Sequence, residues 1–292
     1  MSAKVPVRVD GRELILSNLG KVLYPAAGFT KAEVIDYYSR IAPYLLPHLL
    51  GRPLTVKRYP NGVDGAFFFE KNAPSHTPAW LRLVTLPVPG STMDRDSIDF
   101  AVIEDLPGLV YYANLAALEL HVPQWRVSAR DEAEPPDTLV FDLDPGAPAT
   151  VVECCRVALL LREVLAADGL DARPKTSGNK GMQLYARWDG RDDPSAYAKR
   201  LAQLLEKDVP ALVVSVMARK ARPGKVFIDW SQNNPAKTTV APYSLRAGQR
   251  PTVSTPLLWE EVDGCRDPGD LVFTAPDVLG RVEEHGDLFA QA

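Results

Sequence analysis

The sequence predicts an α+β fold, in which helices and strands are mixed without regular alternation. Two observations support this class. Segments with the two-residue periodicity of strands and segments with apolar residues at helical spacing both occur throughout the 292 residues. Their order lacks the strand–helix–strand repeat of a doubly wound parallel sheet. A composition of 46% hydrophobic and 24% charged residues is typical of a globular chain and excludes a disordered one.

The first half is expected to begin with a hairpin and a helix. VPVRVDGRELIL alternates on both sides of Asp10-Gly11, which is a typical two-residue hairpin turn. Thr30 and Glu33 have capping-box spacing, and the apolar residues that follow predict a helix from about Lys31 to about Leu46. Further segments are a strand at LTVKRY, a strand at AFFFEK, an apolar helix over about 106–118 and a strand at LELHV.

The second half mixes strands and helices more evenly. TLVFDLD predicts a buried strand, TVVECCRVALLLREVLAAD a helix, RPKTS and MQLYARW two strands, SAYAKRLAQLLEK a helix and KVFIDWS another strand. Because no internal repeat or low-complexity linker divides the chain, one domain over residues 1–292 is expected. The three cysteines have neither disulfide-framework nor zinc-site spacing, so they are expected to pack in the core.

Charge is unevenly distributed along the chain. The net charge is -4, but residues 1–60 hold nine Lys and Arg against four Asp and Glu, and residues 211–250 hold seven against one. This pattern predicts one basic cleft on an acidic body, the alternative being chance clustering on a solvated surface. The start, MSAKVPVRVDG, has no apolar signal segment, and no apolar stretch is long enough to span a bilayer. A cytoplasmic protein with no membrane partner is therefore expected.

Two carboxylates interrupt an apolar strand in TLVFDLDPG. Asp142 and Asp144 point to one face because side chains alternate along a strand, and Asp229 is a third acid in the apolar KVFIDWS. Unpaired carboxylates in such surroundings are costly, and a divalent cation would remove the penalty. Mg²⁺ and Mn²⁺ prefer oxygen ligands, often together with substrate phosphates. The alternative is an Asp144-Pro145-Gly146 turn, with Asp142 held by backbone donors.

Candidate phosphate ligands occur in KTSGNKG, residues 175–181. The Ser177 hydroxyl, the backbone amides freed by the glycines and the Lys180 ammonium could bind a triphosphate, although a plain β-turn explains the motif equally well. Further cations bracket the third aspartate in sequence, and a solvated surface is the alternative for each: Arg222, Lys225, Lys237 and Arg246.

These motifs resemble those of the archaeo-eukaryotic primase superfamily. Together with SNLGKVLYP, GRPLTVKRYPNGVDGAFFFEK, ALELHVPQW, LVFDLDPG and VFIDWSQN, they make the chain similar to the polymerase domain of bacterial ligase D over about residues 10–290. The resemblance implies a mixed, two-lobed primase-polymerase-like core. It also implies a template-directed nucleotidyltransferase that fills gaps and 3′ overhangs at double-strand breaks in non-homologous end joining and prefers ribonucleotides, with Ku and a DNA ligase as partners.

The resemblance also assigns residues. Asp142, Asp144 and Asp229 would hold two Mn²⁺ or Mg²⁺ ions. Asn18, Lys21 and Lys31 would hold a 5′-phosphate, and Arg58, Phe68 and Phe69 would contact DNA, although one of the three consecutive phenylalanines is expected to be a core residue. The incoming NTP or dNTP would be held by Lys57, His121, Ser177, Lys180, Gln183, Arg222, Gln232, Lys237 and Arg246.

Two departures from the family pattern bear on function. Gln183 stands where the family usually has His, which keeps a hydrogen-bond donor but loses a cationic charge, so weaker triphosphate binding is expected. No Lys-x-Asp-Gly ligase motif occurs, which leaves open whether this is a stand-alone polymerase or an excised domain. The alternatives to a repair polymerase are a primase that starts chains de novo and a non-catalytic module that bridges DNA ends.

Overall fold

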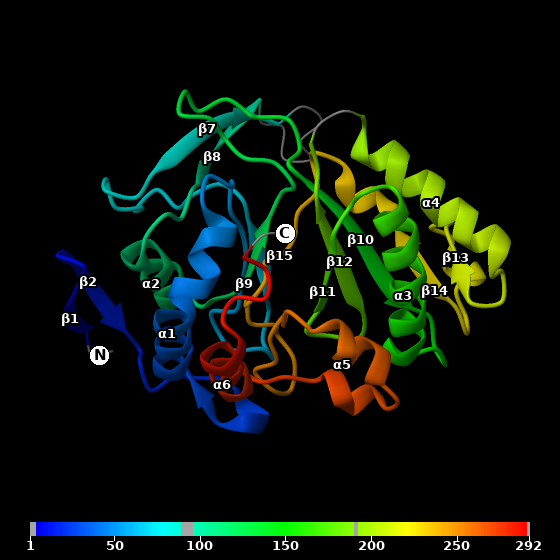
Figure 1. Cartoon of the computed structure of the whole chain (residues 1–292). Coiled ribbons are helices and arrows are strands. Elements are labelled where there is room, and N and C mark those ends of the chain that lie inside the picture. The colour runs from blue at the N-terminus through cyan, green and yellow to red at the C-terminus, as the bar shows by residue number, and fades with distance from the viewer. Residues whose placement is uncertain (1–3, 89–95, 190–191, 291–292) are drawn as a thin grey trace.

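The computed structural model describes residues 4–88, 96–189 and 192–290. It has the predicted α+β architecture, with two main sheets that lie side by side (Figure 1). One sheet has the strand order β15-β9-β5-β6 and the other β11-β12-β10-β14-β13. We refer to the parts built around these sheets as the first lobe and the second lobe.

The first lobe contains most of the N-terminal half and the C-terminal helix. Its helices are α1 (Lys31–Leu49), α2 (Leu106–Asn114) and α6 (Ala275–His285). Its strands are β1 (Lys4–Val9), β2 (Arg12–Ser17), β3 (Val22–Tyr24), β4 (Phe29–Thr30), β5 (Thr55–Arg58), β6 (Phe68–Glu70), β7 (Leu83–Pro87), β8 (Ser97–Ala101), β9 (Ala117–Val122) and β15 (Thr239–Val240).

The second lobe carries the aspartate-bearing strands. Its helices are α3 (Val151–Ala167), α4 (Pro194–Asp208) and α5 (Trp259–Gly264). Its strands are β10 (Thr138–Pro145), β11 (Ala172–Thr176), β12 (Met182–Arg187), β13 (Val213–Val214) and β14 (Val226–Asp229). Short 3₁₀ segments add Pro25–Ala27, Arg219–Ala221, Trp230–Asn233 and Pro268–Leu271.

Local sequence signals explain the first elements. β1 and β2 pair antiparallel around the Asp10-Gly11 turn, as predicted. Thr30 caps α1, since its side chain accepts from the Glu33 amide and Glu33 reaches back to the Thr30 amide, and the helix runs three residues beyond the predicted Leu46 to Leu49. The predicted helix over 106–118 was too long, because α2 ends at Asn114 and β9 begins at Ala117.

Each lobe has its own hydrophobic core. In the second lobe, Phe141, Leu143 and Ile228 point to the face that packs against α3 and α4, which cover that side of the sheet in Figure 1. Asp142, whose side chain alternates with theirs, therefore points to the opposite face. The cysteines are buried and free, as predicted. Among the residues described, no helix has the length and apolarity that crossing a membrane requires.

Candidate active site

A row of four polar side chains crosses the second sheet. Asp142 on β10 lies opposite Asp229 on β14 and opposite Gln183 on β12, and Gln183 lies opposite Lys175 on β11. Residues directly opposite one another in antiparallel strands point to the same face, with Cβ atoms about 4.5–5.5 Å apart. The sheet register therefore brings two of the predicted acids together beside an amide and a lysine.

The acids destabilise one another's charged forms. Burial, followed by repulsion from Asp144, raises the pKa of Asp142 well above its usual value, while the hydrogen bond from Gln183 opposes the shift. Partial burial and the charge of Asp229 likewise raise the pKa of Asp144, and Arg222 lowers it. The cluster therefore has an excess of negative charge that a cation would neutralise.

Asp229 is fixed by the segment that follows it. Its Oδ1 accepts hydrogen bonds from the Ser231 amide and hydroxyl, and its Oδ2 accepts from Gln232 Nε2 at 2.8 Å. The Lys237 ammonium donates to Ser231 Oγ. Gln232 and Lys237 are both predicted nucleotide ligands. Gln232 thus holds Asp229 directly, and Lys237 holds it through the Ser231 hydroxyl.

The Ser-Gly-x-Lys-Gly turn lies against the aspartate strand. A Cβ on Gly181 would stand 2.1 Å from the carbonyl oxygen of Leu143, and a Cβ on Gly178 would stand 2.5 Å from Cγ of Arg246, so both positions require glycine. Ser177 Oγ accepts from the Gly181 amide at 3.2 Å. The turn is thereby packed between β10 and Arg246.

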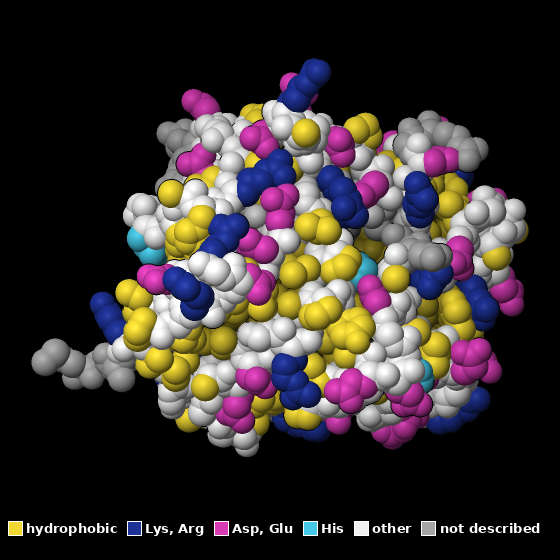
Figure 2. All heavy atoms as spheres, turned by 60° about the vertical axis from the view of Figure 1, so that its left-hand side comes forward, with side chains coloured by type: hydrophobic (Ala, Val, Ile, Leu, Met, Phe, Trp, Pro, Cys, Tyr) yellow, Lys and Arg dark blue, Asp and Glu magenta, His cyan; other side chains and the backbone are white. Residues whose placement is uncertain are grey.

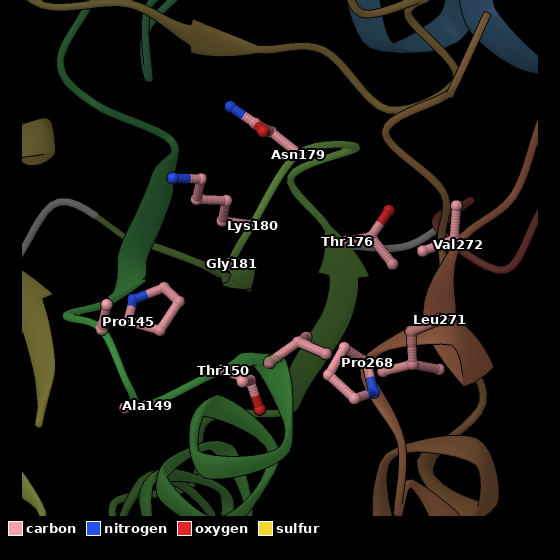
Figure 3. Close-up of a pocket in the computed structure, with 12 residues that line it drawn as sticks. Pro145, Ala149, Thr150, Thr176, Asn179, Lys180, Gly181, Pro268, Leu271 and Val272 are labelled. Atoms are coloured by element: carbon pink, nitrogen blue, oxygen red, sulfur yellow. The ribbon is translucent and has the colours of Figure 1, made fainter. Parts of the chain in front are cut away.

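Lys180 lines a cavity of about 290 Å³ beside this turn. In Figure 3 its side chain points from the turn toward the strand that ends at Pro145, and Thr150 at the start of α3 lies on the other side of the cavity. Much of the lining is apolar, including Pro145, Leu271 and Val272. Lys180 is exposed, which leaves its ammonium accessible to an anion at the mouth of the site.

Three predicted nucleotide ligands converge on a buried acid, Glu119, on β9. His121 Nε2 lies 3.0 Å, Arg246 Nη1 3.6 Å and Lys57 Nζ 3.7 Å from its carboxylate. Burial alone would raise the pKa of Glu119, but the hydrogen bond from His121 and the charges of Arg246 and Lys57 outweigh it and lower the pKa to about 2. Glu119 therefore remains ionised and holds the three basic side chains together.

The three consecutive phenylalanines are all exposed. Phe67 is 51%, Phe68 43% and Phe69 59% exposed, so the expectation that one of them is a core residue was wrong. Lys57 Nζ lies 4.0 Å from the Phe67 ring centre, and Arg58 stacks on Phe68 at 5.2 Å. These cations hold the rings on the surface, where each ring could stack on a nucleotide base.

The predicted 5′-phosphate residues also come together. The Lys21 amide donates to the Asn18 carbonyl, and the Lys31 amide to the Lys21 carbonyl. Lys31 is only 5% exposed, and burial, followed by the charges of Lys21 and Arg58, lowers its pKa to about 8. An anion would relieve this repulsion. By contrast, the face in Figure 2 carries Lys and Arg interspersed with Asp and Glu, without a continuous basic patch.

Three contributors to the site did not stand out in the sequence. Glu119 carries the same signal as Asp142, an acid inside an apolar strand, and could have been found by it. Lys175 and Ser231 carried no such signal, because lysine and serine are ordinary in short strands and loops. Their importance comes from the sheet register and from the turn after β14.

The donor set suits a hard divalent cation. Carboxylate oxygens are the ligands that Mg²⁺ and Mn²⁺ prefer, and burial together with repulsion between the acids raises the pKa values of Asp142 and Asp144. Within residues 4–88, 96–189 and 192–290, however, no three His, Cys, Asp or Glu side chains already form a metal-binding group. Asp229 instead satisfies its oxygens within its own turn. A site using all three acids therefore stays a prediction.

Comparison with known proteins places the chain in one family. Residues 30–289 match the family model described as "LigD, primase-polymerase domain". The chain is 45% identical over 278 residues to the multifunctional non-homologous end joining protein LigD of Mycolicibacterium smegmatis. The matched region covers 94% of this chain and 35% of that protein. It is 32% identical over 281 residues to the bifunctional LigD of Bacillus subtilis, covering 95% of this chain and 44% of that protein.

A solved structure gives the same result. The polymerase domain of Mycobacterium tuberculosis ligase D, solved in complex with DNA, superposes with a TM-score of 0.88 at 43% identity, covering 94% of this chain and 96% of that one. The chain spans between a third and a half of the length of the two LigD relatives named above. The family model, the LigD relatives and the solved structure therefore agree, and the chain belongs to the family of LigD primase-polymerase domains.

Proposed function

We propose that the chain is a template-directed nucleotidyltransferase that extends 3′ ends across gaps and overhangs at DNA double-strand breaks. The observation that carries the proposal is the cross-strand pair of Asp142 and Asp229, with Asp144 beside it. Lys175 and Arg222 are near enough to lower the pKa values of Asp142 and Asp144, respectively. Such an arrangement suits transfer of a phosphoryl group from a bound nucleotide to a hydroxyl. Membership of the LigD primase-polymerase family supports the same reaction.

Two buried arginine groups support a triphosphate ligand. Nε of Arg222 and Nε of Arg246 are buried and have no hydrogen-bond partner among the residues described. A buried N–H without an acceptor is costly, and a phosphate oxygen would satisfy it. Ser177 and Lys180 of the glycine turn, and Gln232 and Lys237 beside Asp229, would complete the nucleotide site.

Asp142, Asp144 and Asp229 would hold two divalent ions, Mn²⁺ or Mg²⁺. Such ions, when bound, increase the acidity of the primer 3′-hydroxyl and neutralise charge on the triphosphate. The protein's own part is to orient the carboxylates and to hold the triphosphate with Arg222, Arg246 and Lys180. His121, held by Glu119, is the residue that we propose contacts the sugar and favours ribonucleotides.

The DNA would lie along the first lobe. Phe68, Phe69 and Arg58 would stack on or contact the template, and Asn18, Lys21 and Lys31 would hold the 5′-phosphate across the gap. The relative solved with DNA supports a DNA substrate. We further propose that the domain works with Ku and a DNA ligase in the bacterial cytoplasm, on nucleoid DNA, as the end-joining names of its relatives suggest.

Primer extension on gapped DNA tests the proposal. The assay compares DNA with and without the 5′-phosphate, ATP with dATP, and Mn²⁺ with Mg²⁺, for the wild type, Asp142→Ala and Asp229→Ala. Each substitution should reduce extension at least about a hundredfold, because ion-mediated stabilisation of several kcal/mol is lost and about 1.4 kcal/mol corresponds to tenfold in rate. DNA affinity, measured by fluorescence anisotropy, should change little.

The outcomes separate the candidate functions. Extension by either alanine variant at near wild-type rate would contradict the proposed site. Synthesis without a primer would instead favour a primase. DNA binding with no extension under any condition would favour a non-catalytic module that bridges ends.

A further inference from the structure

Lys175 is a fully buried lysine whose side chain ends beside the aspartate cluster. It is 0% exposed and comes from β11, on the same face of the sheet as Asp142. Gln183, only 4% exposed, lies between the two. A buried lysine without a direct carboxylate partner is uncommon, because desolvation disfavours its charge. Its presence here calls for an explanation in terms of its contacts.

The contacts of Lys175 require three protons on its nitrogen. Nζ lies 2.6 Å from Gln183 Oε1, 2.7 Å from Ser254 Oγ and 3.0 Å from the Val240 carbonyl oxygen. Ser254 Oγ uses its own proton to donate to the Thr176 carbonyl, so it can only accept from Lys175. All three partners are therefore acceptors, and only an ammonium group has three N–H donors to satisfy them. Burial lowers the pKa of Lys175 well below its usual value, and the charge of Asp142 together with these three acceptors favours the charged form against that shift.

The ammonium fixes the orientation of the Gln183 amide. With Oε1 toward Lys175, Nε2 must point to Asp142, and it donates to Oδ1 at 3.0 Å. The flipped amide would place N–H groups against the ammonium and an oxygen against the carboxylate, which is unfavourable at both ends. The contacts thus form a chain in one direction, from Lys175 through Gln183 to Asp142, which we call the Lys175–Gln183 relay.

We propose that the Lys175–Gln183 relay is a positioning device for Asp142: it fixes the carboxylate through Oδ1 and leaves the other oxygen for a divalent cation. This inference rests on the proposed function, in which Asp142 is a metal ligand. In the relay, Gln183 Oε1 accepts from Lys175 and one N–H of Nε2 donates to Asp142, a role that differs from direct phosphate binding. The family histidine would bring a positive charge to this position. In this chain the ammonium of Lys175, which contacts Gln183 on the side away from Asp142, provides a positive charge instead.

Binding of Mn²⁺ in the absence of nucleotide and DNA tests the relay independently of turnover. Free Mn²⁺ is measured by electron paramagnetic resonance during titration of the wild type, Gln183→Leu, Lys175→Met and the double variant. Each single substitution should lower the Mn²⁺ affinity at least about tenfold. The double variant should bind Mn²⁺ as tightly as the single variant with the lower affinity, because all three variants break the same relay. In extension assays, kcat at a fixed Mn²⁺ concentration should fall more than KM for the nucleotide rises.

Two further variants keep the test decisive if Lys175→Met fails to fold. Gln124 is equally buried, at 4% exposed, and its amide donates to Thr239 Oγ1 rather than to an acid, so Gln124→Leu should leave Mn²⁺ binding unchanged. Gln183→His should retain most of the affinity, because a neutral imidazole has one acceptor for Lys175 and one N–H donor for Asp142.

Specific results would overturn the relay. Unchanged Mn²⁺ affinity in Gln183→Leu, with only KM for nucleotide raised, would make Gln183 a phosphate ligand. An equal loss of Mn²⁺ affinity in Gln183→Leu and Gln124→Leu would mean that Gln183 acts only by packing in the core. Failure of the wild type to extend any primer would refute the proposed function instead, while the Mn²⁺ titrations would still decide the relay.

Discussion

At the scale of one residue, Glu119 shows how the side chains of the proposed nucleotide site are held together within the protein. One buried carboxylate accepts contacts from Lys57, His121 and Arg246, while the Ala247 amide donates to it at 3.1 Å. Without it, three basic groups would crowd a partly buried space. The acid therefore stabilises the fold and spaces the cations that would bind phosphate.

Glu119→Gln should make stability less dependent on pH. The pKa of Glu119 is about 2 in the folded protein against 4.5 in the unfolded chain, so its contribution is complete above pH 4.5 and disappears as the pH falls toward 2. A shift of this size corresponds to about 3 kcal/mol at neutral pH. Urea unfolding between pH 3 and 7 measures the effect. A variant as stable as the wild type at pH 7, with the same acid sensitivity, would contradict it.

The sequence could identify residues whose type conflicts with their surroundings, and little beyond that. Asp142 and Asp229 stand out because acids are rare inside apolar strands. Gln183 stood out only through a family resemblance, which predicted its position near phosphate but not its contacts. Lys175 could not be found, because its role depends on which strand lies beside which, and on a register that local residues do not specify.

At the scale of elements, the start of α1 and the end of β2 bring together the residues proposed to hold the 5′-phosphate. The Thr30 capping box sets where α1 begins, and this places Lys31 in the first helical position, buried next to Ser17. Backbone hydrogen bonds join Lys31 to Lys21 and Lys21 to Asn18. The capping box that starts α1 thus also sets the position of Lys31, a proposed phosphate ligand.

Affinity for gapped DNA with a 5′-phosphate should fall as the pH rises through about 8. The Lys31 pKa is about 8, so the free protein loses this charge above that pH, while the phosphate stays doubly ionised. The loss should approach about tenfold per pH unit above pH 8. Anisotropy titrations from pH 7 to 9 measure it, with unphosphorylated DNA and Lys31→Met as controls. Equal pH dependence of both DNA forms would exclude Lys31 as the phosphate ligand.

Long, capped helices and the hairpin were predictable, whereas short strands were not. β13 and β15 have two residues each, which is too few for any periodicity to be recognised. The boundary of α2 was misplaced for a related reason. A continuous apolar run fits a buried helix and a buried strand equally well, and the change occurs at Ala116, whose φ of 57° ends the helical path.

At the scale of the whole molecule, the C-terminal segment joins the two lobes. Phe289 is 2% exposed and packs between Tyr185 of the second sheet, with ring centres 5.5 Å apart, and His48 of α1, with ring centres 6.0 Å apart. Asp287 accepts from His48 and from Tyr243. We propose on this basis that the two lobes fold as a single domain.

Phe289→Ala should lower the stability of both lobes together. Replacing a buried phenylalanine by alanine typically costs about 3–5 kcal/mol, so one cooperative thermal transition should shift to lower temperature. Differential scanning calorimetry measures it. Leu204→Ala, at a site that is 43% exposed, is the matched control and should change stability little. Two thermal transitions, of which only one shifts to lower temperature, would mean that the lobes unfold independently.

The cross-strand row also has a consequence for synthesis on the ribosome. Asp142 leaves the exit tunnel long before Asp229, and Ser254, which holds Lys175, is made later still. At about 5–20 residues per second, a nascent chain therefore spends several seconds with its first two acids and without the strand that completes the pair. Products of premature termination after Gly181 and before β14 would contain Asp142, Asp144 and the glycine turn but lack Asp229. If the proposed function holds, competence for chemistry is therefore acquired only late in translation.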